Sequence, residues 1–164
     1  MPESLIGVVR CDTREKTPYS FSSVQGGVLT RTDTLTVGDY ALDFEGKNPR
    51  IAAVERKSKA DFIQCVGSQR DRFFKQISLL RGSVDRPLLL IEADLTALET
   101  GDWRSMITPA QALSTLSTAM QIVPVVLART RAEAERACYR HLRLAAQERY
   151  RESREFARLL LAGQ

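Results

Sequence analysis

The chain has 164 residues, of which 43% are hydrophobic and 27% are charged, and its formal net charge is +4. This composition is typical of a folded globular protein and argues against an intrinsically disordered chain. It contains no run of about eighteen uncharged apolar residues and no signal-peptide pattern, so we expect an intracellular protein without a membrane span. We expect a single domain over residues 1–164, with a core at about residues 6–150.

The first part of the chain is predicted to consist mainly of strands. LIGVVRC, residues 5–11, is a short apolar run that predicts a buried strand. Residues 28–44 predict one or two strands, broken near Asp33 and Gly38. Residues 50–57, RIAAVERK, predict a further strand.

A helical pattern follows that strand and extends over residues 59–82. Ser58 precedes it in the position of an N-cap, and Gly82 is a plausible stop. The pattern consists of apolar residues at helical spacing, namely Phe62, Ile63, Val66, Phe73, Phe74, Ile77 and Leu80. It predicts one face packed against a core.

Strands and helices alternate in the second half. PLLLIEAD, residues 87–94, predicts a central strand, and residues 109–121 predict a helix with proline at its first position. Residues 124–128 predict another buried strand, and Thr130 with Glu133 forms a capping box that opens a long Arg-rich helix. This order predicts an α/β sandwich with a mixed sheet that is parallel in its second half.

The chain lacks the residues for a zinc site or a disulfide framework. Cys11, Cys65 and Cys138 are far apart in sequence, and His141 is the single histidine. We therefore expect buried free thiols.

The positive charge is concentrated in two blocks. Residues 50–75 carry seven basic against three acidic side chains, and residues 129–164 carry nine against five. Such blocks fit contact with phosphate groups, although two solvated helix faces would give the same counts.

The stretch VERKS, residues 54–58, places an acid and an amine on one surface. Side chains alternate along a strand, so Glu55 and Lys57 point to the same face and Arg56 points to the other. Asp39 is able to bring a second carboxylate from a neighbouring strand. Two carboxylates suit a hard divalent cation such as Mg²⁺, while an ammonium group orients water or offsets the charge that grows on a phosphate during hydrolysis.

Structural explanations exist for each of these charged residues. Asp61 lies three residues after Ser58 and is able to complete a helix cap. Asp12 and Asp39 are each acceptable turn residues. Glu55 and Lys57 are able to form a surface ion pair. Arg70 and Arg72 are solvated in one interpretation and contact phosphate in another.

A longer motif distinguishes between these explanations. Gly38-Asp39, then residues 54–58, then Asp61 match the pattern GD…ERKxxxD, and the sequence resembles the nuclease domain of the XPF/Mus-type (ERCC4 domain) structure-specific endonucleases of the PD-(D/E)XK superfamily. CDTRE at residues 11–15 resembles the first-strand motif of that family, and QRDRFFKQ at residues 69–76 resembles its post-motif helix.

The resemblance implies a restriction-endonuclease-like three-layer sandwich, in which helices flank a central mixed sheet. It implies dependence on Mg²⁺ or Mn²⁺, with Asp39, Glu55 and Asp12 as metal ligands. The implied catalytic set consists of Asp39, Glu55, Lys57, Asp12 and Asp61. The implied DNA-facing residues are Arg14, Arg56, Arg70 and Gln76, with Glu15 beside them.

The resemblance also implies a DNA substrate with a branch, flap, fork or single-strand/double-strand junction, and a homodimer. The terminal helix offers Leu142, Ala145 and Ala146 as a face to be buried. We expect no tandem helix-hairpin-helix module of the kind common in this family within residues 1–164, which leaves the preferred DNA structure open. Two alternatives are a non-catalytic DNA-binding or scaffold subunit, which the intact motif argues against, and a resolvase or restriction-like nuclease of the same superfamily.

Overall fold

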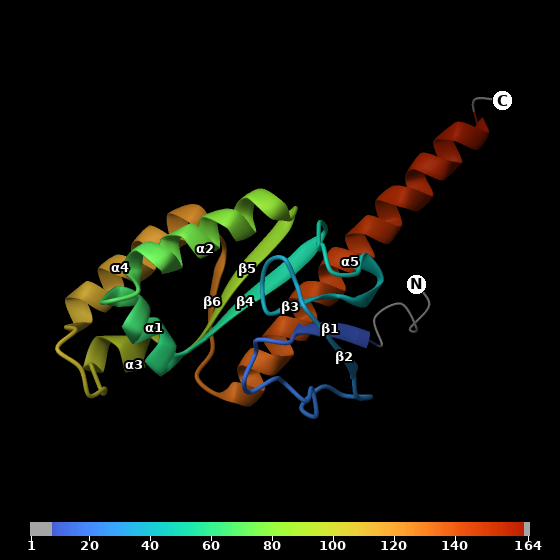
Figure 1. The fold of residues 1–164 in the computed structure, drawn as a ribbon. Coiled ribbons are helices and arrows are strands. Elements are labelled where there is room, and N and C mark those ends of the chain that lie inside the picture. The colour runs from blue at the N-terminus through green and yellow to red at the C-terminus, as the bar shows by residue number, and fades with distance from the viewer. Residues whose placement is uncertain (1–7, 163–164) are drawn as a thin grey trace.

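The computed structural model describes residues 8–162 (Figure 1). Six strands form one sheet in the order β2-β1-β3-β4-β5-β6. The strands are β1 (Val8–Asp12), β2 (Leu29–Asp33), β3 (Tyr40–Leu42), β4 (Ala52–Ser58), β5 (Arg86–Glu92) and β6 (Val125–Leu127). The helices are the short 3-10 helix η2 (Asp43–Glu45), then α1 (Lys59–Val66), α2 (Arg70–Ser83), α3 (Leu95–Thr100), α4 (Pro109–Ile122) and α5 (Arg131–Ala162).

The sheet is the middle of three layers. Helices α1–α4 cover one face and α5 crosses the other (Figure 1). Strand β5 contributes to both cores, because Leu89 and Ile91 pack with α1, α2 and α4, whereas Leu88 and Leu90 pack with α5. The structure thus confirms the predicted α/β sandwich with a central mixed sheet between helices.

Strand directions also follow the prediction for the second half of the sheet. β4, β5 and β6 are parallel, and β3 is antiparallel to both β1 and β4. β1 and β2 form a second parallel pair that the sequence did not reveal. The predicted break between two strands near Asp33 and Gly38 is confirmed, whereas residues 5–7 of the first predicted strand lie outside the described residues.

The helix predicted over residues 59–82 is wrong in one respect, because it is two helices. α1 ends at Val66, and Gly67 leaves the helical region with φ −99° and ψ −110°. A side chain at Gly67 would place its Cβ 3.1 Å from Cδ1 of Ile107, so glycine also allows the loop to approach closely. The apolar spacing continues across the break because both helices pack on the same core. The short helix α3 was not predicted either.

The apolar face of α5 is used within the chain itself. Leu142, Ala145 and Ala146 are buried in the core between α5 and the sheet. The sequence had suggested these residues as a surface for a second copy, but they are buried within the chain and are not free for that contact. The C-terminal part of α5 extends beyond the sheet (Figure 1), and there Phe156 and Leu159 are exposed.

Two further expectations concern the chain as a whole. The thiols of Cys11, Cys65 and Cys138 are free and buried, as predicted. Among residues 8–162, no helix is both long enough and apolar enough to cross a membrane.

Candidate active site

Gly38 directs the chain into β3 so that Asp39 faces β4. Gly38 has a φ of 72°, and a Cβ added there would lie 3.0 Å from the Cβ of Ala53 and 3.1 Å from the carbonyl oxygen of Val54. Only glycine fits this approach without strain. The next residue, Asp39, donates its backbone N–H to the same Val54 oxygen at 2.8 Å. Glycine at position 38 is therefore required by the junction of β3 with β4.

Strand alternation on β4 places Glu55 and Lys57 on the face covered by α2. Nζ of Lys57 lies 2.7 Å from Oε1 of Glu55, and Glu55 is 1% exposed. Gln76, on α2, donates Nε2 to the same Glu55 oxygen at 2.7 Å and accepts a hydrogen bond from Lys57 at 3.2 Å. One oxygen of Glu55 is thus held by two donors.

Asp39 and Glu55 each retain one uncommitted oxygen. Oδ2 of Asp39 accepts the backbone N–H of Arg56 at 2.7 Å, whereas Oδ1 of Asp39 and Oε2 of Glu55 have no hydrogen-bond partner among the described residues. These are hard oxygen donors on adjacent strands, and they fit a divalent cation that keeps several of its waters. No group of three or more potential ligands occurs in residues 8–162, so the protein would supply two carboxylates.

The electrostatics of this pair also favour a cation. Burial, and then the negative charge of Glu55, raise the pKa of Asp39 to about 8. Burial likewise raises the pKa of Glu55, although the Lys57 ammonium opposes that shift. Burial disfavours the charged form of Lys57, but the Glu55 carboxylate outweighs it, so the pKa of Lys57 is raised. A bound divalent cation would relieve the repulsion between the two carboxylates.

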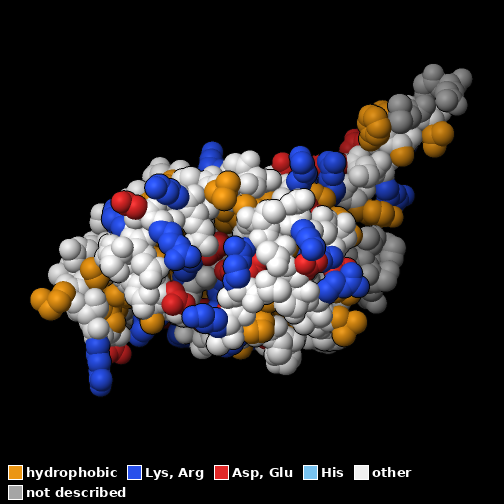
Figure 2. Space-filling view, in the orientation of Figure 1, with side chains coloured by type: hydrophobic (Ala, Val, Ile, Leu, Met, Phe, Trp, Pro, Cys, Tyr) orange, Lys and Arg blue, Asp and Glu red, His pale blue; other side chains and the backbone are white. Residues whose placement is uncertain are grey.

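The pair lies in a groove of about 780 Å³. Its walls include Ser58 and Asp61 at the start of α1 and Gln76 on α2. Its rim carries the exposed basic residues Arg14, Lys16, Arg72 and Lys75. Figure 2 shows this arrangement of charge, with Lys and Arg side chains spread over the face and carboxylates partly hidden between them. A recessed acidic pair under a basic rim fits a polyanionic ligand, which would contact the rim directly and the acidic pair through a bound cation.

The model of the ERCC4 domain matches residues 11–139, a span that includes the whole groove. This chain belongs to the ERCC4 domain family. No curated protein matches the sequence.

Solved structures agree on the fold of this ERCC4 domain. XPF from Aeropyrum pernix has a TM-score of 0.66 and 18% sequence identity, covering 84% of this chain and 61% of that chain. XPF from Aeropyrum pernix in complex with DNA has a TM-score of 0.63 and 18% identity, covering 87% of this chain and 66% of that chain. The domain thus spans less than two thirds of these XPF chains.

Asp12 of the ERCC4 domain donates its backbone N–H to the carbonyl oxygen of Asp39 at 2.8 Å, but its carboxylate is fully engaged. Oδ1 accepts from the backbone N–H and Nε of Arg14, and Oδ2 accepts from Nη2 of Arg14 and the backbone N–H of Leu35. Asp12 is 1% exposed. The structure therefore does not bring Asp12 to the cation position as the third ligand expected from the sequence.

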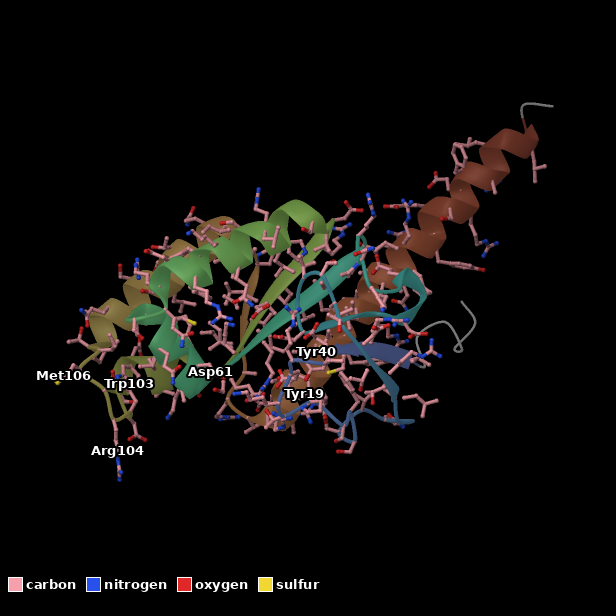
Figure 3. The ribbon with its side chains drawn as sticks, viewed as in Figure 1. Tyr19, Tyr40, Asp61, Trp103, Arg104 and Met106 are labelled. Carbon is pink, nitrogen blue, oxygen red and sulfur yellow. The ribbon has the colours of Figure 1, made fainter. Side chains whose placement is uncertain are left out.

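Asp61 has the geometry of a helix cap. Its backbone N–H donates to Oγ of Ser58 at 3.1 Å, and Oγ of Ser58 donates to Oδ2 of Asp61 at 2.6 Å. Asp61 is nevertheless exposed in the groove wall, and Figure 3 places it at the start of α1. The capping role is present, and a catalytic role for Asp61 stays a prediction.

Arg56 points to the face of the sheet opposite the acidic pair. Its guanidinium pairs with Glu15 at 3.2 Å and with Glu92 at 2.8 Å, and the Arg56 side chain is 7% exposed. It also lies over the ring of Tyr19, which stacks on Tyr40 (Figure 3). This placement favours an internal structural role for Arg56 over the expected contact with DNA.

Arg70 is also occupied within the chain. Its guanidinium donates to Oγ1 of Thr115 on α4 and lies over the ring of Phe74. The cations on α2 that form neither a side-chain hydrogen bond nor an ion pair among the described residues are instead Arg72 and Lys75. Lys75 was missed in the sequence, although its spacing of three residues from Arg72 would have indicated the same helix face.

Proposed function

We propose that this ERCC4 domain is a metal-dependent DNA endonuclease that hydrolyses phosphodiester bonds. The observation that carries the proposal is the buried carboxylate of Glu55 and the half-buried carboxylate of Asp39, with one uncommitted oxygen each and the Lys57 ammonium beside Glu55. Mg²⁺ or Mn²⁺ is the expected cation, because both accept hard oxygen ligands and retain bound water.

Each side chain has a separate role in this proposal. Asp39 and Glu55 hold the cation, which supplies positive charge to the phosphate and an activated water when bound. Lys57 is protonated at neutral pH, since its pKa is raised. It therefore acts as a fixed positive charge toward the oxygens of the reacting phosphate rather than as a general base. Gln76 fixes the positions of the Glu55 and Lys57 side chains relative to each other.

Branched, flap or forked DNA is the proposed substrate. Support comes from the open groove, its basic rim and the structural likeness to an XPF chain solved with DNA.

We also propose a homodimer. The exposed Phe156, Leu159 and Leu161 on α5 support association, because they leave an apolar surface in water. Sedimentation equilibrium of the wild type and of a Phe156→Glu, Leu159→Glu variant tests this, and a monomeric wild type would exclude the dimer.

The decisive experiment compares cleavage with binding. Wild type, Glu55→Gln and Lys57→Met are incubated with Mg²⁺ or Mn²⁺ and a panel of flap, fork and Holliday-type substrates. We expect wild type to cut and both variants to lose at least about 100-fold in rate. DNA affinity in Ca²⁺ should change by less than about threefold, because the rim cations remain.

Three results would redirect the proposal. Undiminished cutting by either variant would remove that residue from the mechanism. A wild type that binds branched DNA and cuts none of the panel would favour a scaffold subunit. Cutting of linear duplex at the same rate as of branched DNA would favour a nuclease with a different substrate preference.

A further inference from the structure

The outer face of α5 carries a row of arginines that the candidate active site does not use. The helix contains eight arginines and no lysine over its 32 residues. Its inner face is fixed against the sheet by Leu142, Ala145 and Ala146. With about 3.6 residues per turn, positions on the opposite side of the helix recur at spacings of three and four. Six arginines occupy that side and form what we call the arginine stripe, namely Arg136, Arg140, Arg143, Arg151, Arg154 and Arg158.

The arginine stripe is exposed and has no acidic partner. All six residues are exposed, and none of them forms an ion pair or a side-chain hydrogen bond in the part of the chain that the structure describes. Nearby acids on α5 are paired elsewhere, since Glu133 pairs with Arg129 and Glu148 pairs with Arg86. The stripe is therefore a row of uncompensated positive charge.

The spacing of these arginines opposes helix formation. Arg136 and Arg140 are four residues apart, and Arg140 and Arg143 are three apart, so each pair is adjacent on the helix surface. The same two spacings recur in the second half of the stripe. Like charges at these spacings destabilise a helix, whereas a merely solvated face usually alternates acids and bases. The arrangement instead matches a ligand that carries a row of negative charge.

Duplex DNA fits the shape of the stripe. The helix rises about 33 Å between Arg136 and Arg158, which is close to one turn of the duplex. Arginine also donates to phosphate oxygens through a planar group that holds two of them at once. A membrane surface fits less well, because the apolar face of α5 is buried against the sheet along residues 134–146 and is not free to enter a bilayer.

The stripe and the groove lie on opposite sides of the domain. Glu55 and Lys57 point to the sheet face that α2 covers, whereas α5 crosses the other face (Figure 1). DNA has a persistence length of about 150 base pairs, so a short duplex does not bend around the domain to reach both surfaces. Occupying both surfaces requires two duplex segments, and a branched DNA has them.

We propose that the arginine stripe of α5 is a second DNA-binding surface, which holds the phosphate backbone of one duplex arm while another segment of the same DNA lies in the groove. The two-segment arrangement rests on the proposed function, because that function takes branched DNA as its substrate. Binding of a duplex by the stripe does not itself require cleavage. Contacts to phosphate carry no sequence information, so the stripe recognises any duplex arm.

The first test measures affinity for an uncut three-way DNA junction in Ca²⁺ at several salt concentrations. The stripe variant is Arg136→Ala, Arg140→Ala, Arg143→Ala, and the control variant, with the same loss of charge at exposed positions off the stripe, is Arg50→Ala, Arg81→Ala, Arg149→Ala. We expect the stripe variant to bind at least about 10-fold more weakly, with a slope of log K against log salt that is smaller by about three. The control should lose less than about threefold. Equal losses would make net charge the cause and overturn the proposal.

The stripe variant is expected to fold, because alanine favours a helix and the replaced side chains have no ion pair or hydrogen bond among the described residues. Circular dichroism checks this expectation. If the triple variant unfolds, the single variant Arg140→Ala replaces it, with an expected decrease in slope of about one.

The second test asks whether two segments are bound at once. A single duplex as long as one arm should lose less than about threefold in affinity in the stripe variant, because it still binds in the groove. An equal fold-loss on the single duplex and on the junction would overturn the two-segment arrangement.

The third test locates the DNA on the helix. Arg140→Cys and Arg149→Cys are each labelled with a thiol-reactive photo-crosslinker, since the three native thiols are buried. Position 140 should crosslink to the junction, whereas position 149, on the same helix but off the stripe, should not. Equal crosslinking from both positions, or none from either, would overturn the proposal. Binding of wild type to phosphatidylserine vesicles that is lost in the stripe variant, with unchanged affinity for the junction, would replace DNA by a membrane.

These readouts use uncut DNA and therefore remain valid if wild type cuts no substrate, so failure of the stripe and failure of the nuclease proposal are distinguishable. If wild type cuts, the stripe variant should raise KM at least about 10-fold and keep kcat within about twofold. A lower kcat with an unchanged KM would mean that α5 acts on the groove through the sheet, and would overturn the stripe as a binding surface.

Discussion

Gln76 of α2 donates a hydrogen bond from Nε2 to Oε1 of Glu55 on β4 at 2.7 Å, and so links a helix to the strand that carries the acidic pair. Its side-chain oxygen accepts from Lys57 at 3.2 Å. One amide therefore sets the orientation of both groups and leaves Oε2 of Glu55 free.

Gln76→Leu should lower kcat about 10-fold with a small change in KM, because Glu55 and Lys57 lose a fixed orientation while the rim cations remain. Steady-state kinetics on the preferred substrate measure this. Ser78→Ala, an exposed change on the same helix, is the control and should behave like wild type. An unchanged kcat in Gln76→Leu would show that packing alone orients the pair.

Asp39→Asn should stabilise the protein without divalent cations, and increasingly so as the pH rises. The pKa of Asp39 is raised to about 8 by burial and by Glu55, so the folded state binds a proton more strongly than the unfolded chain does. The stability that depends on this proton is complete below about pH 4 and is lost progressively up to about pH 8. Asparagine does not titrate, and its oxygen is still able to accept the Arg56 N–H.

Thermal unfolding at pH 4, 6 and 8 measures this effect. We expect no clear difference at pH 4 and a gain of at least about 1 kcal/mol at pH 8. A gain that is equal at all three values would mean that the titration of Asp39 is not responsible.

Arg56→Ala should destabilise the protein by about 3 kcal/mol, which corresponds to a lower Tm by about 10 °C. The substitution leaves Glu15 and Glu92 without their shared partner at a largely buried position. Arg72→Ala, at an exposed residue without an ion pair among the described residues, is the control and should change stability by less than about 0.5 kcal/mol. Reduced DNA affinity with unchanged stability in Arg56→Ala would instead support the contact expected from the sequence.

Gly38→Ala should destabilise the protein more than Gly27→Ala does. The two glycines have nearly the same φ, 72° and 71°, so both variants carry the same backbone strain. A Cβ at Gly38 meets Ala53 and Val54 of β4, whereas a Cβ at Gly27 meets nothing within 4 Å. We expect a difference of at least about 1 kcal/mol in the free energy of unfolding, measured with urea. An equal loss of unfolding free energy in the two variants would mean that β3 and β4 move apart easily to make room for the added Cβ.

The fold was largely predictable because its signals are local. Apolar runs predicted β1, β5 and β6, and alternation along β4 correctly separated Glu55 and Lys57 from Arg56. The family resemblance had nevertheless assigned Arg56 to DNA, which the alternation already contradicted. The break between α1 and α2 could not be read from spacing, because both helices bury their apolar residues in one core.

The site was less predictable because it depends on contacts between distant segments. The role of Asp12 is set by Leu35, which supplies an N–H from 23 residues away. The orientation of Arg70 depends on Thr115 in another helix. Neither partner carries a motif, so only the folded chain reveals that these two residues are occupied.

The closeness of the Asp39 and Glu55 charges has a consequence for the stability of the domain. The charge of Glu55 opposes ionisation of Asp39, so a neutral residue at position 39 relieves an internal conflict while the hydrophobic layers on either side of the sheet remain intact. Without a bound cation the fold therefore favours a neutral residue at position 39, and the proposed cation would supply the free energy that keeps an acid there.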